Sequence, residues 1–349
     1  MFCSGRKSAS ILLTLMLSGC GSGGSSTSAG ASPIPPTQIV NTPAPVSTLQ
    51  AANLQALLPA AYPAGSSEDV SFTKLNAFRV GQGLGPVNQN TKIDEAARLH
   101  AAYVTLNQSG ADPHSEVVGK PGFTGANVQD RLKAVGYAVN SSTEVIGFSL
   151  QFPNPDTSAI DNLINTVYHR SAMMMQNLTD VGFSGENASS PLYVNLGSIK
   201  AQVNAGDYFG FYPANQQTGV WLTHTLESPN PFYQEMEMTQ ANMCTRTSSP
   251  ISFTSEASTS LTVTIFTVTE EGQATPLDAR LITKTTNAQN GNYLSANEAY
   301  LVGKAPFKPN TMYNVRFVGK AIGAATGTAT NLNFDKAWSF TTGSYKRNC

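Results

Sequence analysis

The pattern of apolar residues changes once along this chain, near Pro250, and this change constrains the fold more than any other sequence feature. Before it, apolar residues recur at helical spacing in segments that begin near Ser66, Thr91, Val128 and Ile160. Short runs rich in aromatic and β-branched residues lie between and after these segments. After Pro250 the runs alternate with a period of two, and no helix is predicted. The sequence therefore predicts an α+β layered domain followed by an all-β antiparallel sandwich.

The expected elements have recognisable boundaries. The first helix begins after a cap at Ser66 and ends at Gly81, and the third runs from about Val128 to Val135 before Gly136. The second begins at Thr91, and the fourth covers 160–167. The expected strands are 144–150, 180–183, 193–199 and 208–212 in the first domain, and 260–265, 312–318 and 337–341 in the second.

The first twenty residues have the pattern of an export signal. Arg6 and Lys7 precede a short apolar run, Ile11 to Leu17, which is too short to span a bilayer. The run closes on Leu17-Ser18-Gly19-Cys20, which resembles the lipobox of bacterial lipoproteins. This resemblance implies that residues 1–19 are removed and that Cys20 is acylated. The alternative is an ordinary cleaved signal with an incidental cysteine.

Lipidation at Cys20 implies a place in the cell envelope, with the membrane as a partner through the lipid. Residue 21 is Gly and not the Asp that often retains lipoproteins at the inner membrane, so the outer membrane is expected in a diderm cell. Residues 20–65 are rich in Gly, Ser and Pro and predict a flexible tether.

Composition excludes one class of partner and suggests one covalent link. Charged residues make up 12% of the chain and the formal net charge is −1, so no electrostatic nucleic-acid surface is expected. Cys3 would leave with the signal and Cys20 would be lipidated. Cys244 and Cys349 then remain as a pair in an oxidising compartment, and a disulfide between them is predicted. The alternative is two buried or reduced thiols.

Several short motifs between residues 66 and 200 follow one another in a specific order. They are Asn76-Ala77-Phe78-Arg79, Gly83-Leu84-Gly85-Pro86, Ala96-Ala97-x-x-His100, Asp112-Pro113-His114-Ser115, Asp130-Arg131-Leu132 with Gly136-Tyr137, Tyr168-His169-Arg170, and Asp180-Val181-Gly182-Phe183-Ser184-Gly185. In this order they resemble the bacterial branch of the CAP superfamily, the SCP-like family of cysteine-rich secretory, antigen 5 and pathogenesis-related proteins. The resemblance implies an α-β-α layered domain, placed at 66–212, with a central cleft.

The C-terminal part resembles a different module. Residues 305–315, followed by 338–342, are similar to the last strands of bacterial immunoglobulin-like modules. An Ig-like β-sandwich is therefore expected at 246–349, with 213–245 as a connector. Such modules usually serve as spacers or adhesion surfaces, and the fold alone does not decide between these roles.

The resemblance to the CAP superfamily implies a cleft site made of His114, Glu144 and His169. Two departures reduce it: Thr143 and Val145 flank Glu144 in place of the usual Gly and Asn, and no second glutamate precedes His169. Two imidazoles and one carboxylate suit a divalent metal such as Zn or Mg, so a metal is a possible cofactor. The alternative is a hydrogen-bonded polar cluster that organises the cleft walls.

Other polar residues receive structural interpretations. Arg79 and Arg170 lie in apolar helical segments and predict clamps to a carboxylate or to loop carbonyls, with ligand binding as the alternative. His100 is interpreted as a satisfied core-edge histidine and His224 as a turn residue. Met173, Met174 and Met175 are interpreted as packing residues rather than soft-metal ligands.

The favoured function is a lipid-anchored binding or interaction protein whose cleft takes a small ligand or a cell-envelope component. The sequence contains no nucleophile elbow, no His-Glu-x-x-His and no phosphate-binding glycine loop, which lowers the support for most enzyme classes. A metal-dependent hydrolase of peptide or envelope substrates is the main alternative, with His114 and His169 as ligands and Glu144 as ligand or general base. A purely structural envelope protein is the third possibility.

Overall fold

The computed structural model describes residues 49–345, with gaps at 108–111, 149–157, 187–189, 236, 240 and 326–327. The described residues belong to a single unit of the chain. The predicted signal peptide, Cys20 and Cys349 lie outside them. Within the described part, no helix has both the length and the apolar character needed to cross a membrane.

The first half is built on a four-stranded sheet with the order β1-β3-β4-β2. Its strands are β1 (Asn88–Gln89), β2 (Ser141–Gly147), β3 (Asp180–Ser184) and β4 (Leu192–Ser198). Strand β4 is buried along its whole length and is antiparallel to both β3 and β2, whereas β1 is parallel to β3. Strand β2 therefore forms one edge of this sheet.

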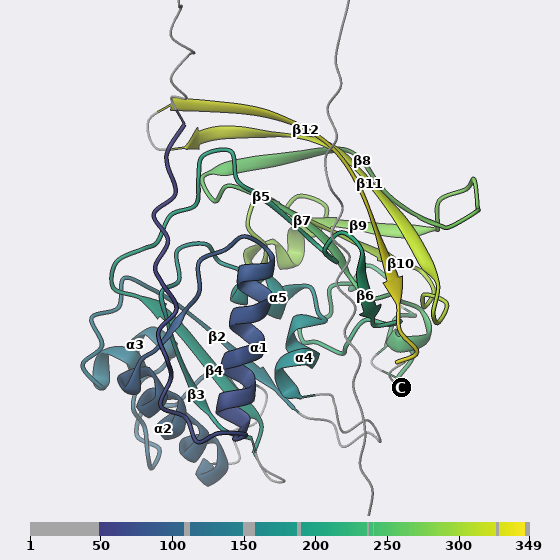
Figure 1. The fold of residues 1–349 in the computed structure, drawn as a ribbon. Helices are drawn as coiled ribbons and strands as arrows, with labels where there is room; N and C mark the ends of the chain where they lie inside the picture. Colours follow the sequence, from purple (N-terminus) through teal and green to yellow (C-terminus); the bar gives the residue numbers. More distant parts are fainter. Residues whose placement is uncertain are drawn as a thin grey trace, which may run out of the picture. The chain divides into compact units, whose positions relative to one another are not determined.

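Helices cover both faces of this sheet (Figure 1). On one face, α1 (Ser67–Gly81), α4 (Ala159–Ile164) and α5 (Tyr168–Met173) share a core with Val194 and Leu196 of β4. On the other face, α2 (Thr91–Asn107) packs its small residues against Tyr193, and α3 (Val128–Ala134) packs beside it. The predicted mixture of helices and sheets in layers is confirmed.

Gly182 explains how closely α2 approaches the sheet. A Cβ atom at this position of β3 would lie 2.2 Å from the backbone nitrogen of Asp94 in α2. Any larger residue would push the helix away from the sheet. Because Asp94 also accepts the backbone N–H of Phe183 at 2.9 Å, the helix and strand are joined at this point.

The fourth predicted helix, over 160–167, is interrupted in the structure. It ends at Ile164, and a new helix begins at Tyr168. Thr166 donates its hydroxyl to the carbonyl of Leu163, and the carboxylate of Glu227 accepts the backbone N–H groups of Val167 and Tyr168, both at 2.8 Å. These groups therefore bond to side chains instead of continuing the helical ladder.

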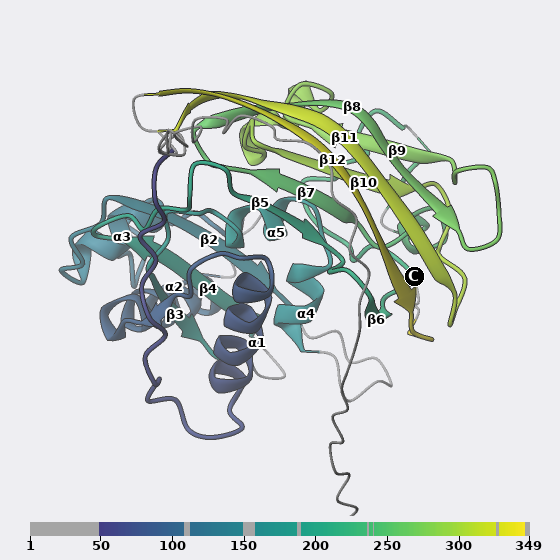
Figure 2. The same ribbon diagram turned by 45° about the horizontal axis from the view of Figure 1, so that its top comes forward.

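The second half consists of two four-stranded sheets with the orders β5-β7-β10-β9 and β6-β12-β11-β8 (Figure 2). The first contains β5 (Phe209–Tyr212), β7 (Ile251–Ser255), β9 (Ala279–Thr283) and β10 (Glu298–Gly303). The second contains β6 (Gln217–Val220), β8 (Thr259–Glu270), β11 (Met312–Ala325) and β12 (Thr328–Thr342). Short 3-10 helices η1 (Met243–Thr245) and η2 (Ala288–Tyr293) occur in the connections.

The two sheets share one aromatic core. Phe253 of β7 stacks on Phe317 of β11 with ring centroids 3.7 Å apart, and both side chains are fully buried. Further large aromatic rings, among them Phe266, Phe334 and Trp338, are buried in the same core. The predicted all-β second half is therefore present, while its Ig-like character stays a prediction.

The limits of the two halves differ from those expected at 66–212 and 213–245. Strand β5, inside the first range, pairs with β7, and β6, inside the second range, pairs with β12. Residues 209–220 therefore belong to the sandwich. Local periodicity cannot show this, because a strand has the same pattern whichever sheet it joins.

The last part of the predicted flexible tether, residues 49–65, lies along the first half. Asn53 forms a β-bridge with Val203, and Tyr62 donates its hydroxyl to Asp94 at 2.7 Å. The Tyr62 ring also packs edge-on against Phe72 and Phe183. The aromatic and polar side chains of this segment thus give it fixed partners that its composition does not predict.

The two predicted structural arginines are both fully buried. Arg79 donates to the carbonyls of Gly85, Met173 and Met175, and its burial lowers its pKa to about 10. Arg170 donates to the carbonyls of Ile164 and Pro250, and its guanidinium lies 4.4 Å from the ring centroid of Tyr212. Arg170 therefore joins α5 to the sandwich.

Cys244 is buried at the start of the second half and is disulfide-bonded. Its predicted partner, Cys349, lies outside the described residues. The pairing of these two cysteines therefore stays a prediction.

Candidate functional site

A cleft lies beside β2, the edge strand of the first sheet, and consists of two cavities that we call the first and second lobes. The first lobe has a volume of about 290 Å³ and the second about 460 Å³. His114, His169 and Ser228 line both, so the lobes meet at these residues. The cleft is therefore bordered by the first half and by two connections of the second half, the segment after β6 and the segment at the end of η2.

His114 stands on one side of the cleft, on the loop after α2. Its Nδ1 lies 3.0 Å from Oε1 of Glu144, which is on β2. The other oxygen of Glu144 accepts a hydrogen bond from Arg131 of α3 at 2.8 Å. Arg131 is fully buried and also donates to the carbonyl of His114 at 3.0 Å. One arginine thus fixes both the carboxylate and the loop that carries the histidine.

The environment of Glu144 keeps it ionised. Burial by itself would raise the pKa of this carboxyl, but the hydrogen bond from His114 and the positive charge of Arg131 outweigh burial, and the net pKa is lowered. Because an ionised carboxylate can only accept hydrogen bonds, the hydrogen between Glu144 and His114 lies on Nδ1 of the imidazole.

His169 stands on the other side of the cleft, in α5. Its Nδ1 lies 3.3 Å from the hydroxyl oxygen of Thr166 and 3.5 Å from Oε2 of Glu227. The Thr166 hydroxyl gives its own hydrogen to the carbonyl of Leu163, so it accepts from His169. Nδ1 of His169 therefore also carries a hydrogen.

Glu227 is a fully buried carboxylate from the segment that follows β6. Burial would raise its pKa, but hydrogen bonds from His169 and His224 and their charges prevail, so the pKa falls to about 2. His224 contacts it at 3.0 Å, in addition to the two backbone N–H groups at the start of α5. All of this makes Glu227 an ionised anchor for the His169 side of the cleft.

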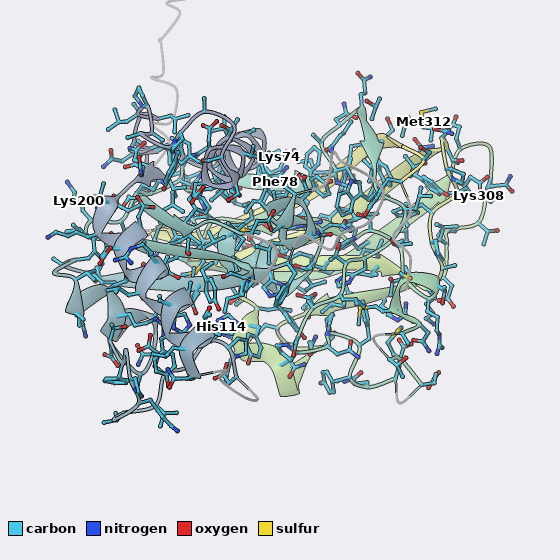
Figure 3. All side chains as sticks on the ribbon, turned by 90° about the horizontal axis from the view of Figure 1, so that it is seen from below. Lys74, Phe78, His114, Lys200, Lys308 and Met312 are labelled. Atoms are coloured by element: carbon cyan, nitrogen blue, oxygen red, sulfur yellow. The ribbon has the colours of Figure 1, made fainter. Side chains whose placement is uncertain are left out.

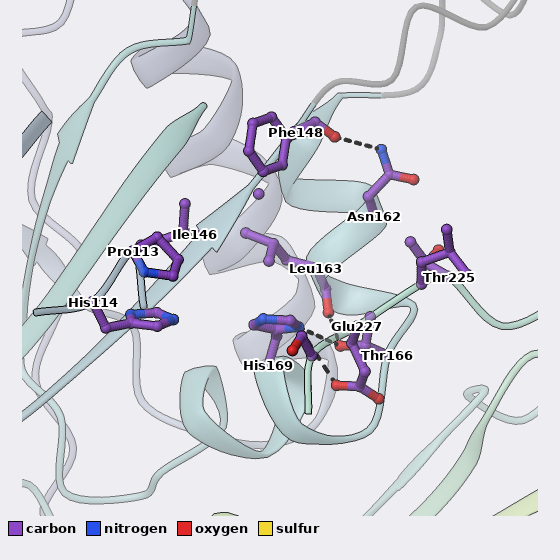
Figure 4. Close-up of a pocket in the computed structure, with 13 residues that line it drawn as sticks. Pro113, His114, Ile146, Phe148, Asn162, Leu163, Thr166, His169, Thr225 and Glu227 are labelled. Atoms are coloured by element: carbon purple, nitrogen blue, oxygen red, sulfur yellow. Dashed lines mark hydrogen bonds and ion pairs between the residues drawn. The ribbon is translucent and has the colours of Figure 1, made fainter. Parts of the chain in front are cut away.

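The two sides have the same chemical design. In each, a buried carboxylate lies next to Nδ1 of a histidine, so Nδ1 carries a hydrogen and Nε2 is the ring nitrogen left for the cleft. Figure 4 shows both rings directed into one cavity. Among the described residues, no hydrogen bond is recorded for Nε2 of either ring. The cleft thus offers two imidazole nitrogens in the same chemical setting.

The structure brings together His114 and Glu144 in direct contact, and it places His169 on the same cleft without a bond to either. Oε1 of Glu144 contacts His114 and Oε2 accepts from Arg131, so the contacts join His114 to Glu144 but not to His169. Over the described ranges, no group of three or more His, Cys, Asp or Glu side chains is arranged to hold a metal ion. The two free imidazoles fall short of the three protein ligands of catalytic zinc sites.

Sequence reasoning missed Glu227, the second carboxylate of the cleft. The resemblance to the CAP superfamily implies a second glutamate before His169, whereas Glu227 follows that histidine in the chain. The only local signal is its neighbour His224, three residues earlier, for which the sequence predicts a turn. In the structure His224 is fully buried, so burial separates it from an ordinary turn residue.

His100 was expected to be a satisfied core-edge histidine. It is fully buried, with Nδ1 at 2.9 Å from Glu116 and Nε2 at 2.9 Å from the carbonyl of Pro113. Both contacts are to the loop that carries His114. His100 therefore helps to fix that loop from beneath.

Comparison with known proteins gives limited structural similarity. No protein-family model matches this chain, and no curated protein matches it. An extracellular protein containing an SCP domain from Bacillus anthracis is similar over 38% of this chain and 40% of its own, with 17% identity and a TM-score of 0.32. An outer surface protein from Borrelia burgdorferi is similar over 38% of this chain and 90% of its own, with 11% identity and a TM-score of 0.31. The chain thus spans less than half the length of the first of these structures.

The two lobes differ in their chemistry. Apolar side chains dominate the first lobe beyond the histidines: Pro113, Ile146, Phe148, Leu163 and Leu226. The second lobe combines polar groups with two tyrosines that lie against each other, Tyr168 and Tyr293. The cleft can therefore hold an apolar group on one side of the histidine pair and a polar group on the other.

Proposed function

We propose that this protein is an extracytoplasmic, lipid-anchored binding protein of the CAP type, whose cleft binds a ligand and does not hydrolyse it. The CAP assignment is supported by the order of motifs from Asn76 to Gly185 and by helices on both faces of a sheet. The ligand would be a small molecule or a component of the cell envelope.

One observation carries the binding function: both carboxylates of the cleft are fully engaged. Glu144 is held by Arg131 and His114, and Glu227 by two backbone N–H groups and two histidines. A carboxylate that acts as a general base needs a lone pair that can reach a water or a nucleophile. The two imidazoles keep Nε2 on the cleft and are the candidate bases of the hydrolase alternative, whereas the apolar walls are the lining expected in a recognition site.

The cleft function is tested with an amphipathic anionic fluorescent probe that has an aromatic body, 1-anilinonaphthalene-8-sulfonate, added to the purified full-length protein. Phe148 is 61% exposed and lines the first lobe, so Phe148→Asp introduces a charge there without disturbing the core. We expect this substitution to reduce probe affinity about tenfold, because a carboxylate replaces an apolar contact surface.

Met312→Asp is the matched control. Met312 is an exposed apolar residue of the sandwich that lies well away from His114 in Figure 3. We expect its probe affinity to equal that of the wild type. Equal loss in both variants, or no loss in either, would contradict the cleft proposal. Stoichiometric zinc in the purified protein that disappears in His169→Ala would favour the alternative, a metal-dependent hydrolase.

Anchoring is the second part of the proposal and rests on Cys20 at the end of the lipobox-like motif. We expect Cys20→Ser to move the protein from the membrane fraction to the soluble fraction or to leave it unprocessed. Mass spectrometry of the N-terminal peptide checks this. A wild-type chain that is fully soluble and carries no acyl group would show that the motif is not a lipidation site.

A further inference from the structure

We infer that the second lobe of the cleft is a saccharide-binding subsite, with Tyr293 as its stacking platform. The inference rests on the proposed binding function and names the class of ligand that this part of the cleft takes. The ligand would be a neutral oligosaccharide, which carries apolar C–H faces together with many hydroxyl groups.

Tyr293 is the first observation. Its side chain is 53% exposed although it lines the lobe, and its ring lies 5.3 Å from that of Tyr168 at an interplanar angle of 34°. Tyr168 is buried and is held from behind by Asn287, which donates to its hydroxyl at 2.6 Å. An exposed aromatic ring with a fixed back support loses little conformational entropy on binding, so it suits stacking against the C–H face of a sugar ring.

The segment that carries Tyr293 is held in place. The next residue, Leu294, is buried in a core that also contains Tyr168. The backbone N–H of Ser295 donates to the buried carboxylate of Glu298 at 2.6 Å. The platform is therefore positioned by the contacts of the two residues that follow it in the chain.

Polar side chains surround this platform. Thr143, Asn292 and Ser295 line the lobe, and their side chains have no recorded hydrogen-bond partner in the part of the chain that the structure describes. Hydroxyl and amide groups of this kind can both donate and accept, as sugar hydroxyls require. The volume of about 460 Å³ lies in the range of small-molecule sites.

An extended peptide is the competing ligand, because β2 is an edge strand beside the cleft. The last three residues of this strand are poorly placed for pairing with another chain. Val145 and Ile146 are 1% and 8% exposed, and the Leu163 side chain lies so close to Gly147 that a Cβ there would be 2.8 Å away. Since only Ser141 to Glu144 are partly exposed, an added strand would have few residues to pair with, and recognition by side chains is favoured.

The test is calorimetric titration of the full-length protein with two trisaccharides, tri-N-acetylglucosamine and maltotriose. We expect at least one of them to bind, and Tyr293→Ala to weaken that binding about tenfold. Tyr293→Phe should retain it, because the ring and not the hydroxyl makes the stacking surface. Met312→Ala, on the distant sandwich strand, should bind like the wild type.

The inference is overturned if neither trisaccharide binds, or if Tyr293→Ala binds as tightly as the wild type. It is also overturned if hexa-alanine binds in a Tyr293-dependent way and the saccharides do not. Retained binding of 1-anilinonaphthalene-8-sulfonate by the wild type in these cases would leave the proposed cleft function standing. If Phe148→Asp and Met312→Asp changed the dye affinity equally, the proposed cleft function itself would be contradicted.

Discussion

Arg131→Met is expected to lower the free energy of unfolding by about 3–5 kcal/mol, because it leaves the buried carboxylate of Glu144 without its cation. Arg131 and Glu144 are 0% and 3% exposed, and their atoms lie 2.8 Å apart. Methionine keeps much of the side-chain volume, so the loss reports on the charge and its hydrogen bonds. Urea unfolding at neutral pH measures the effect.

Two controls define this first result. Arg98 forms an exposed ion pair with Glu95, and the two side chains are 61% and 43% exposed. Arg98→Met removes this pair and should lower the free energy of unfolding by at most about 1 kcal/mol. The double variant Arg131→Met with Glu144→Met should recover part of the loss, since it removes both buried charges. Similar small losses in Arg131→Met and Arg98→Met would mean that Glu144 is not held by a buried ion pair.

Glu227→Gln is expected to remove on the order of 3 kcal/mol of stability at neutral pH. The estimate follows from the difference between the ordinary carboxyl pKa of 4.5 and the folded value of about 2, at about 1.4 kcal/mol per pH unit. Because the folded pKa is the lower one, the contribution is present above pH 4.5 and is lost as the pH falls toward about 2. The difference between wild type and variant should therefore shrink over this interval.

The measurement is a series of urea unfolding curves between pH 7 and pH 2. Glu95→Gln serves as the control, since the Glu95 carboxylate is exposed, and it should differ little from the wild type across the series. A Glu227→Gln difference that stays constant down to pH 2 would show that the carboxylate is not the source of the effect. A variant as stable as wild type at neutral pH would have the same meaning.

These two substitutions affect opposite sides of the cleft, and their origins in the sequence differ. His114 and Arg131 lie in motifs that follow one another along the first half, and the resemblance to the CAP superfamily implies Glu144 beside His114. Glu227 has no such pattern. Its partners Val167, Tyr168 and His169 lie far before it in the chain, and only the return of the chain after β6 brings it to α5.

Some helix boundaries depend on neighbouring residues and follow from the sequence, whereas others depend on residues far away in the chain. The start of α1 after Ser66 and its end at Gly81 agree with the sequence, because a cap and a stop depend on neighbouring residues. The break between α4 and α5 does not, because the groups that replace the helical bonds include Glu227. A periodic apolar pattern continues through the break and gives no sign of it.

The sequence by itself determined the layered first half and the all-β second half, and its resemblance to the CAP superfamily implied His114, Glu144 and His169 as candidate residues. Only the tertiary structure decided that β5 and β6 join the sandwich and that residues 49–65 lie against the first half. It also decided that Arg131 forms an ion pair with Glu144. Periodicity and capping are set within a few residues, whereas strand pairing and the neutralisation of a buried charge depend on residues that only the folded chain brings together.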